Sequence, residues 1–104
     1  MQVPKPNHKR RVPKQADRNK FSKEVMQQIY ERDDGICQIC FSSRGTEIHH
    51  IKFRSSGGRG VKSNGILLCP YCHRLAHQEW EVAEGLRLRA KNKYGPDYYK
   101  DRWD

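Results

Sequence analysis

Four cysteines stand in two closely spaced pairs, and their spacing points to a single metal ion. The pairs are Cys37 with Cys40 and Cys69 with Cys72, and 28 residues separate the first pair from the second. Two Cys-x-x-Cys pairs supply four thiolates to one tetrahedral zinc ion, whereas a redox motif needs only one pair. Because four thiolates leave no coordination position open, we expect a structural Zn²⁺ that stabilises the fold and takes no part in chemistry.

Four of the five histidines lie between and just after these pairs, which favours a second site of a different kind. Adjacent residues on a strand point to opposite faces, so one of His49 and His50 can bind a metal while the other handles protons. His73 and His77 are four residues apart and share one helical face, a spacing that suits joint metal ligation. Imidazole ligands leave positions open for water and a phosphate oxygen, as a catalytic metal requires.

Each of these residues also has a simpler interpretation. His77 taken alone fits a helix-surface residue as well as a ligand. His73 fits the zinc knuckle, although four cysteines already complete that shell. Asn64 taken alone is an ordinary turn residue beside a glycine. His49 and His50, side by side on a half-buried strand, are hard to explain as packing residues.

The elements that position the histidines are expected from periodicity and turn signals. Ser22 is a plausible N-cap for a helix whose apolar residues recur at helical spacing until residues 33–35 stop it. Residues 47–53 alternate like a short strand, and the first two histidines of the cluster lie on it. Residues 54–65 are rich in glycine and serine, which indicates a mobile or ligand-approaching loop.

The second half of the chain is expected to continue with a strand and helices. Residues 66–68 form a brief apolar strand, and a helix follows the second cysteine pair through about Glu84. A basic helix over residues 86–94 is expected to end at Gly95 and Pro96. This succession of elements predicts a small α+β fold.

The charge of the chain points to a polyanionic partner. The formal net charge is +9, and residues 1–20 hold seven of the Lys and Arg residues against one acidic residue, Asp17. Such an arm favours contact with nucleic acid, although a solvated tail that only aids solubility would look the same. No apolar stretch approaches the length of a membrane span, and the N-terminal residues lack the apolar core of a signal peptide. We therefore expect a cytoplasmic protein.

The motifs together resemble the HNH endonuclease family in its four-cysteine, zinc-containing form, of the small stand-alone type found in phages and bacteria. The resemblance covers roughly residues 30–80 and rests on three runs of sequence, which are Arg32 to Cys40, Glu47 to Ile51, and Asn64 to His73. It implies a ββα-metal fold in which His50 is the general base and Asn64 fixes the active-site loop. It also implies that His49 and His73 bind a catalytic metal.

One position is closer to a particular form of the family, and another departs from it. Many members carry Asp where His49 stands, so the sequence is similar to the double-histidine form of colicin-type nucleases. In that form a histidine matching His77 also binds the metal. Gly65 replaces the bulky apolar residue that usually follows the motif asparagine. Composition and pattern together predict three segments, a disordered basic arm over residues 1–20, a zinc-stapled HNH nuclease domain over 21–85 and a basic, aromatic extension over 86–104.

The resulting hypothesis is a metal-dependent endonuclease that hydrolyses DNA with a single catalytic metal. A neutral imidazole at His50 suits proton transfer from water at neutral pH. The metal is expected to be Mg²⁺, Mn²⁺, Ni²⁺, Co²⁺ or Zn²⁺. Candidate phosphate contacts around the loop are Lys52, Arg54, Arg59 and Lys62, although a merely solvated loop would be basic too.

Two other functions explain part of the same sequence. A non-catalytic zinc module that binds DNA or RNA accounts for the cysteines and the charge but leaves the histidines without a role. A zinc-ribbon adaptor that binds proteins would show no salt-sensitive affinity for DNA. For the nuclease, double-stranded DNA is the expected partner, and a homodimer or a phage packaging partner stays open.

Overall fold

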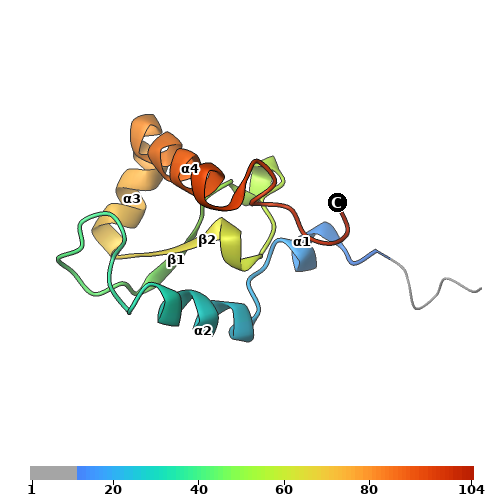
Figure 1. Cartoon of the computed structure of the whole chain (residues 1–104), viewed down its shortest axis with the longest axis horizontal. Helices are drawn as coiled ribbons and strands as arrows, with labels where there is room; N and C mark the ends of the chain where they lie inside the picture. The colour runs from blue at the N-terminus through green and yellow to red at the C-terminus, as the bar shows by residue number, and fades with distance from the viewer. Residues whose placement is uncertain (1–11) are drawn as a thin grey trace, which may run out of the picture.

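The structure is a computed structural model that describes residues 12–104, and its centre is a two-stranded hairpin between helices (Figure 1). In Figure 1, α2 lies below the hairpin, and α3 and α4 lie above it. The elements in chain order are α1 (Gln15–Arg18), α2 (Lys23–Arg32), β1 (Glu47–His50), the 3-10 helices η2 (Arg54–Ser56) and η3 (Lys62–Asn64), β2 (Gly65–Leu68), α3 (Pro70–Gln78) and α4 (Trp80–Tyr94). The succession β1, β2 and α3 confirms the expected α+β fold with a ββα unit.

The strands pair antiparallel, with Glu47 opposite Leu68 and His50 opposite Gly65. The strand expected over residues 47–53 ends earlier, at His50, so the expectation was wrong for its last three residues. The backbone hydrogen bonds between the two strands end there because a side chain takes over as the hydrogen-bond partner. The Oδ1 of Asn64 accepts a hydrogen bond from the backbone N–H of Lys52 at 2.8 Å, and the chain then leaves the sheet.

One face of the hairpin packs on α2. Leu67 is buried there with Phe21 and Ile29. A Cβ atom on Gly65 would lie 2.4 Å from the Cδ1 of Ile29 and 3.0 Å from the ring of Phe21. A larger side chain would therefore displace α2, which explains why a glycine follows Asn64 in this chain.

The opposite face of the hairpin packs on α3 and α4. Ile66 and Leu68 alternate with Leu67 along β2 and therefore point to this side. They form the main core together with Ala76 of α3 and Leu86 of α4. Because the histidines of β1 and α3 border this core, their positions are set by rigid packing.

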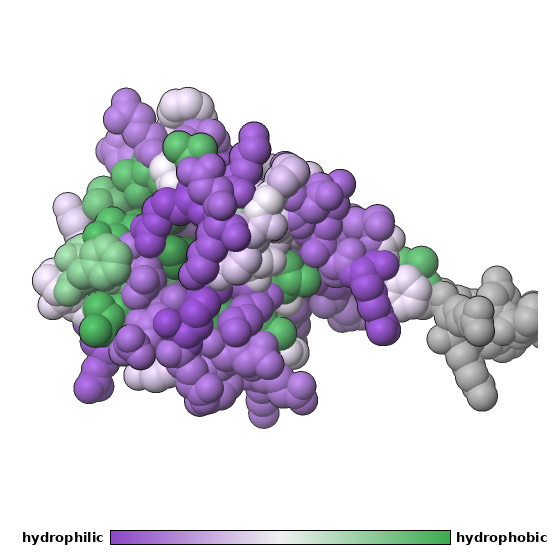
Figure 2. Space-filling view, in the orientation of Figure 1, coloured by the Kyte–Doolittle hydropathy of each residue, from purple (hydrophilic) through white to green (hydrophobic). Residues whose placement is uncertain are grey.

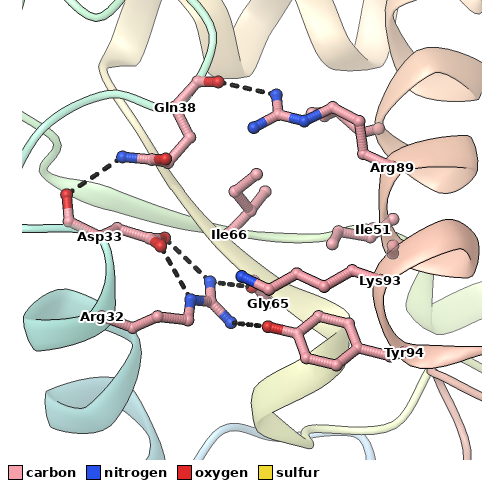
Figure 3. Close-up of a pocket in the computed structure, with 11 residues that line it drawn as sticks. Arg32, Asp33, Gln38, Ile51, Gly65, Ile66, Arg89, Lys93 and Tyr94 are labelled. Carbon is pink, nitrogen blue, oxygen red and sulfur yellow. Dashed lines mark hydrogen bonds and ion pairs between the residues drawn. The ribbon is translucent and has the colours of Figure 1, made fainter.

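The end of α2 covers the free edge of β2. The Oδ2 of Asp33 accepts a hydrogen bond from the N–H of Leu67 at 3.0 Å, and the Leu67 carbonyl accepts one from the N–H of Gln38 at 3.0 Å. Arg32 pairs with Asp33 and donates to the Gly65 carbonyl at 2.7 Å (Figure 3). These contacts satisfy the outward-facing groups of the edge strand, which would otherwise be open to pairing with another chain.

The helices that follow β2 differ from the expected ones. The helix expected through about Glu84 ends at Gln78, because Glu79 is extended with φ −107° and ψ 110°. A second helix, α4, starts at Trp80 and ends before Gly95, whose φ is 95°. The expected basic helix over 86–94 is thus the C-terminal part of α4. The break at Glu79 turns α4 back, so that Leu86 reaches the core against the hairpin.

The described part of the N-terminal arm packs on the fold. Residues 1–11 of the arm expected over 1–20 lie outside the described residues, but 15–18 form α1 and Asn19 is 4% exposed. Figure 1 shows α1 beside the C-terminus, and Arg18 forms an ion pair with Asp101 there. The boundary expected between residues 85 and 86 falls inside α4. Within residues 12–104, no helix combines the length and apolar character needed to cross a membrane.

Candidate functional site

The four cysteines converge into one cluster. Their Sγ atoms all lie within 4.8 Å of one another, with the first pair just before β1 and the second at the start of α3. Hydrogen bonding to Ser42 lowers the pKa of Cys40 to about 5, whereas burial raises the pKa of Cys72 to about 12. A buried thiol of this kind becomes a thiolate when a cation compensates its charge, so the cluster fits the expected structural zinc.

The loop that carries the first cysteine pair presents apolar side chains to solvent. Ile36 is 42% exposed and Phe41 is 61% exposed. Figure 2 shows a largely hydrophilic face whose apolar side chains gather at the left end, where Figure 1 places the loop between α2 and β1. Few apolar side chains are buried at this end of the molecule. The cysteine cluster lies beside the hairpin in their place.

Three of the four predicted histidines form a second cluster. His49 of β1 meets His73 and His77 of α3, and one ring nitrogen from each lies within 4.8 Å of the others. The Nε2 atoms of His73 and His77 face each other at 3.2 Å. The helical spacing of four residues thus places both imidazoles over the buried His49, as three ligands of one metal ion require.

His49 lies at the bottom of this cluster and is completely buried. Neither of its ring nitrogens finds a hydrogen-bond partner among residues 12–104. Burial lowers the pKa of His49 to about 3, so its imidazole is neutral and offers a lone pair. An unpaired buried polar group costs about 1–3 kcal/mol, which coordination of a cation would offset. The orphaned nitrogens are therefore direct support for a metal at these histidines.

Glu47 orients the cluster, and the sequence analysis did not single it out. Its Oε1 lies 2.5 Å from the Nδ1 of His73. Because the carboxylate accepts the Nδ1–H, the lone pair of His73 is on Nε2, the atom that faces His77. The signal that could have revealed Glu47 is its position two residues before His49, which puts both side chains on the same face of β1.

His50 points to the other face of β1, as the alternation of the strand predicts. Its ring stacks near Phe21, with 4.1 Å between centroids, and its Nε2 lies 2.6 Å from the carbonyl oxygen of Asn19. A carbonyl accepts only, so Nε2 carries the hydrogen and Nδ1 is the basic nitrogen of the neutral ring. Burial lowers the pKa of His50 below its ordinary value, and the Asn19 carbonyl opposes this shift.

A cleft of about 450 Å³ joins the two groups of histidines. Ile48 and His50 border it from one face of β1, and His73 and His77 border it from α3. The lining residues are Ile48, His50, Phe53, Arg54, Ser55, His73 and His77. His50, two histidines of the cluster and the cation Arg54 thus border the same space.

Comparison with known proteins decides the family. Residues 37–79, which contain both cysteine pairs, the three clustered histidines and His50, match the sequence profile described as HNH endonuclease. Residues 37–79 of the chain belong to the HNH endonuclease family. The fold and the residues of the resemblance found in the sequence agree with this membership.

One curated relative of this HNH chain is the type IV methyl-directed restriction enzyme EcoKMcrA of Escherichia coli (strain K12). The two sequences are 31% identical over 94 residues, which cover 71% of the chain and 34% of the relative. The HNH chain thus spans about a third of the length of this relative.

Asn64 of the HNH region holds the loop over residues 54–65, here called the cleft loop, in place from the protein interior. It is completely buried and, besides its bond from the Lys52 N–H, its Nδ2 donates to the carbonyls of Lys52 and Arg59 at 3.2 and 3.0 Å. Gly58 passes so close that a Cβ would lie 1.8 Å from the Lys52 carbonyl oxygen. The loop was expected to be mobile or to approach a ligand, and the Asn64 amide holds it in place through bonds that need a close backbone approach.

Two further residues of the HNH site escaped the sequence analysis. Phe53 stacks on His77 with 5.1 Å between ring centroids and an angle of 19°. The guanidinium of Arg87 lies 4.8 Å from the centroid of Phe53. These contacts hold the exposed His77 over the cluster. These contacts join residues that are 24 and 34 positions apart, so no local sequence pattern predicts them.

The four basic residues expected to contact phosphate lie in different surroundings. Arg54 lines the HNH cleft. Lys52 has its Nζ 4.3 Å from the ring centroid of Tyr99, and Lys62 belongs to η3, away from the cleft lining. Arg59 is ion-paired with Asp104. Of the four, Arg54 is thus the cation that lies beside the histidines.

A second hollow lies between α2, β2 and α4 (Figure 3). It encloses about 70 Å³ and is bordered by Arg32, Arg89 and Lys93. Figure 3 shows the side chain of Arg32 engaged with Asp33, Gly65 and Tyr94, and Arg89 with the carbonyl of Gln38. This hollow contains no histidine or cysteine, so neither of the two clusters borders it.

Proposed function

We propose that the chain is a metal-dependent endonuclease that hydrolyses phosphodiester bonds of double-stranded DNA. The observation that carries the proposal is the buried His49, one of whose unpaired nitrogens converges with a nitrogen of His73 and of His77 next to the cleft that His50 lines. Membership of the HNH family supports the reaction class. The name of the E. coli relative, a restriction enzyme, supports DNA as the substrate.

His49, His73 and His77 would hold the catalytic metal, which imidazole ligation allows to be Mg²⁺, Mn²⁺, Ni²⁺, Co²⁺ or Zn²⁺. When bound, a divalent cation stabilises the negative charge that develops on the phosphate and on the departing 3′ oxygen. Glu47 prepares the site by fixing the lone pair of His73. The four cysteines would hold a separate zinc ion with a purely structural role.

His50 would act as the general base. Its Nδ1 takes a proton from a water molecule in the cleft, and the resulting hydroxide attacks phosphorus in line with the 3′ oxygen that leaves. The 3′ oxygen takes a proton from solvent water as it leaves, and His50 returns its own proton to solvent, which gives 5′-phosphate and 3′-hydroxyl ends. Because burial lowers the pKa of His50, the ring is neutral and ready to accept a proton at neutral pH. Arg54, on the rim of the cleft, would contact a phosphate and orient the backbone.

Cleavage of supercoiled plasmid tests this function. Purified full-length protein is incubated with plasmid and Mn²⁺ or Mg²⁺, next to His50→Ala and the control Gln78→Ala, an exposed change at the end of α3. Wild type and control should nick the plasmid. His50→Ala should be slower by roughly 10²–10⁴-fold, the usual contribution of a general base. All three proteins should retain zinc. Absence of cleavage with every metal would favour a non-catalytic zinc module that binds nucleic acid.

A further inference from the structure

The partner of His50 lies outside the region that matches the HNH family. That region covers residues 37–79, whereas the oxygen that accepts the hydrogen of Nε2 belongs to the backbone of Asn19. Asn19 is 4% exposed although it lies in a polar segment. The proposed base is therefore oriented by the N-terminal part of the chain.

Side-chain and backbone contacts hold Asn19 against the cleft loop. Its Oδ1 accepts a hydrogen bond from Arg59 at 2.8 Å, and its Nδ2 donates to the carbonyl of Arg54 at 3.2 Å. The carbonyl of Arg18 accepts a bond from the N–H of Gly60 at 2.8 Å. A Cβ on Gly60 would lie 2.1 Å from the carbonyl oxygen of Lys20, so the two segments are in close backbone contact.

The C-terminal tail locks this arrangement from outside. Arg18 binds both carboxylate oxygens of Asp101, at 3.0 and 2.8 Å. Asp104 bridges Arg18 and Arg59, at 2.9 and 3.1 Å. The side chains of Arg18 and Asp101 are only 12% and 13% exposed, so the pair is shielded from solvent more than an ordinary surface ion pair.

We propose that these five residues form a clasp that fixes both the position and the tautomer of His50. The clasp consists of Arg18, Asn19, Arg59, Asp101 and Asp104. By holding the Asn19 carbonyl against Nε2, it keeps the hydrogen on that atom and leaves Nδ1 as the proton acceptor. The clasp residues are positioning residues, and their role in catalysis rests on the proposed function, in which His50 is the base.

Such a clasp differs from a merely structural brace in what it controls. A brace would change the melting temperature when broken but would leave the tautomer of His50 as it is. The clasp predicts that loosening Arg18 frees the Asn19 carbonyl, so that both tautomers of His50 become populated. An incorrect tautomer cannot accept the proton through Nδ1, and the catalytic rate then falls without a change in DNA binding.

Long-range ¹H–¹⁵N NMR of the histidine side chains in the zinc-loaded full chain reads the tautomer directly. Four proteins are compared, which are wild type, Arg18→Gln, the conservative Arg18→Lys and the control Asp97→Asn. Asp97 forms an exposed ion pair with Lys100 on the same tail and does not touch the clasp. The His50 signals are identified by their loss in His50→Ala. Cleavage is followed on the same samples as kcat and KM.

The expected result is a single Nε2–H tautomer in wild type, Asp97→Asn and Arg18→Lys, and a mixture in Arg18→Gln. The kcat of Arg18→Gln should fall in proportion to the fraction of His50 in the Nδ1–H tautomer, with KM unchanged. A pure Nε2–H tautomer in Arg18→Gln, or a kcat equal to that of Asp97→Asn, would overturn the proposal. If Arg18→Gln fails to fold, Asp104→Asn is judged by the same criteria. If wild type does not cleave DNA, the proposed function fails, and the tautomer comparison still decides whether the clasp exists.

Discussion

Glu47 and His73 form the contact that prepares the proposed metal site, with 2.5 Å between the carboxylate Oε1 and the imidazole Nδ1. This contact leaves the lone pair of His73 on Nε2, which faces His77 at 3.2 Å. The ligand geometry is thus set before a metal arrives. Removal of a carboxylate that orients a ligating histidine typically lowers metal affinity 10–100-fold.

Replacement of Glu47 by Ala should therefore weaken binding of the catalytic metal about 10–100-fold, because His73 loses its fixed tautomer. Isothermal titration of zinc-loaded protein with Ni²⁺ or Mn²⁺ measures this affinity. Glu81→Ala, an exposed acidic residue in the first turn of α4, is the matched control and should bind as wild type does. Equal affinities for both variants would show that Glu47 has no influence on the ligands.

The parts of the site that depend on side-chain spacing were predictable from the sequence. The two cysteine pairs and the interval between His73 and His77 bring their ligand atoms together in the structure as the spacing suggests. The opposite orientation of His49 and His50 follows from strand alternation alone. Glu47 was within reach of the same reasoning, because it precedes His49 by two residues.

Other parts depend on tertiary contacts that no local pattern contains. The acceptor for His50 is a backbone carbonyl, which any residue at position 19 would carry. Arg59 was expected to contact phosphate, but its partner Asp104 is 45 positions away and pairs with it through the fold. The break at Glu79 was missed because this residue type is a good helix former, and packing of α4 on the hairpin decides its extended conformation.

Loss of the proposed zinc site should affect folding, whereas loss of a ligand at the proposed histidine site should not. Cys72→Ser should lose the structural zinc and, with it, the cooperative thermal transition, because a core of this size depends on the metal for stability. His77→Ala, on the exposed face of α3, should keep both. Zinc content by elemental analysis and circular dichroism on heating measure the two effects. A folded, zinc-free Cys72→Ser protein would contradict the structural role of the cysteine cluster.

Two glycines should respond in opposite ways to replacement by alanine. Gly58→Ala should be strongly destabilising, because its Cβ would lie 1.8 Å from the Lys52 carbonyl oxygen and 2.9 Å from the Nδ2 of Asn64. Gly85, in the middle of α4, has no atom within 4 Å of a Cβ, so Gly85→Ala should stabilise the protein by about 1 kcal/mol. Urea unfolding at neutral pH measures both. Equal stabilities would show that the loop is not held as tightly as the Asn64 contacts require.

The central claim is that the histidine cluster holds a metal with which the chain cuts DNA. The most direct test counts metal ions and measures cleavage on the same samples of wild type and His49→Ala, after equilibration with Mn²⁺. Wild type should bind one ion beyond its zinc and nick plasmid, whereas His49→Ala should keep the zinc, lose the second ion and lose cleavage. His49→Ala that retains both the second ion and cleavage at the wild-type rate would contradict the account.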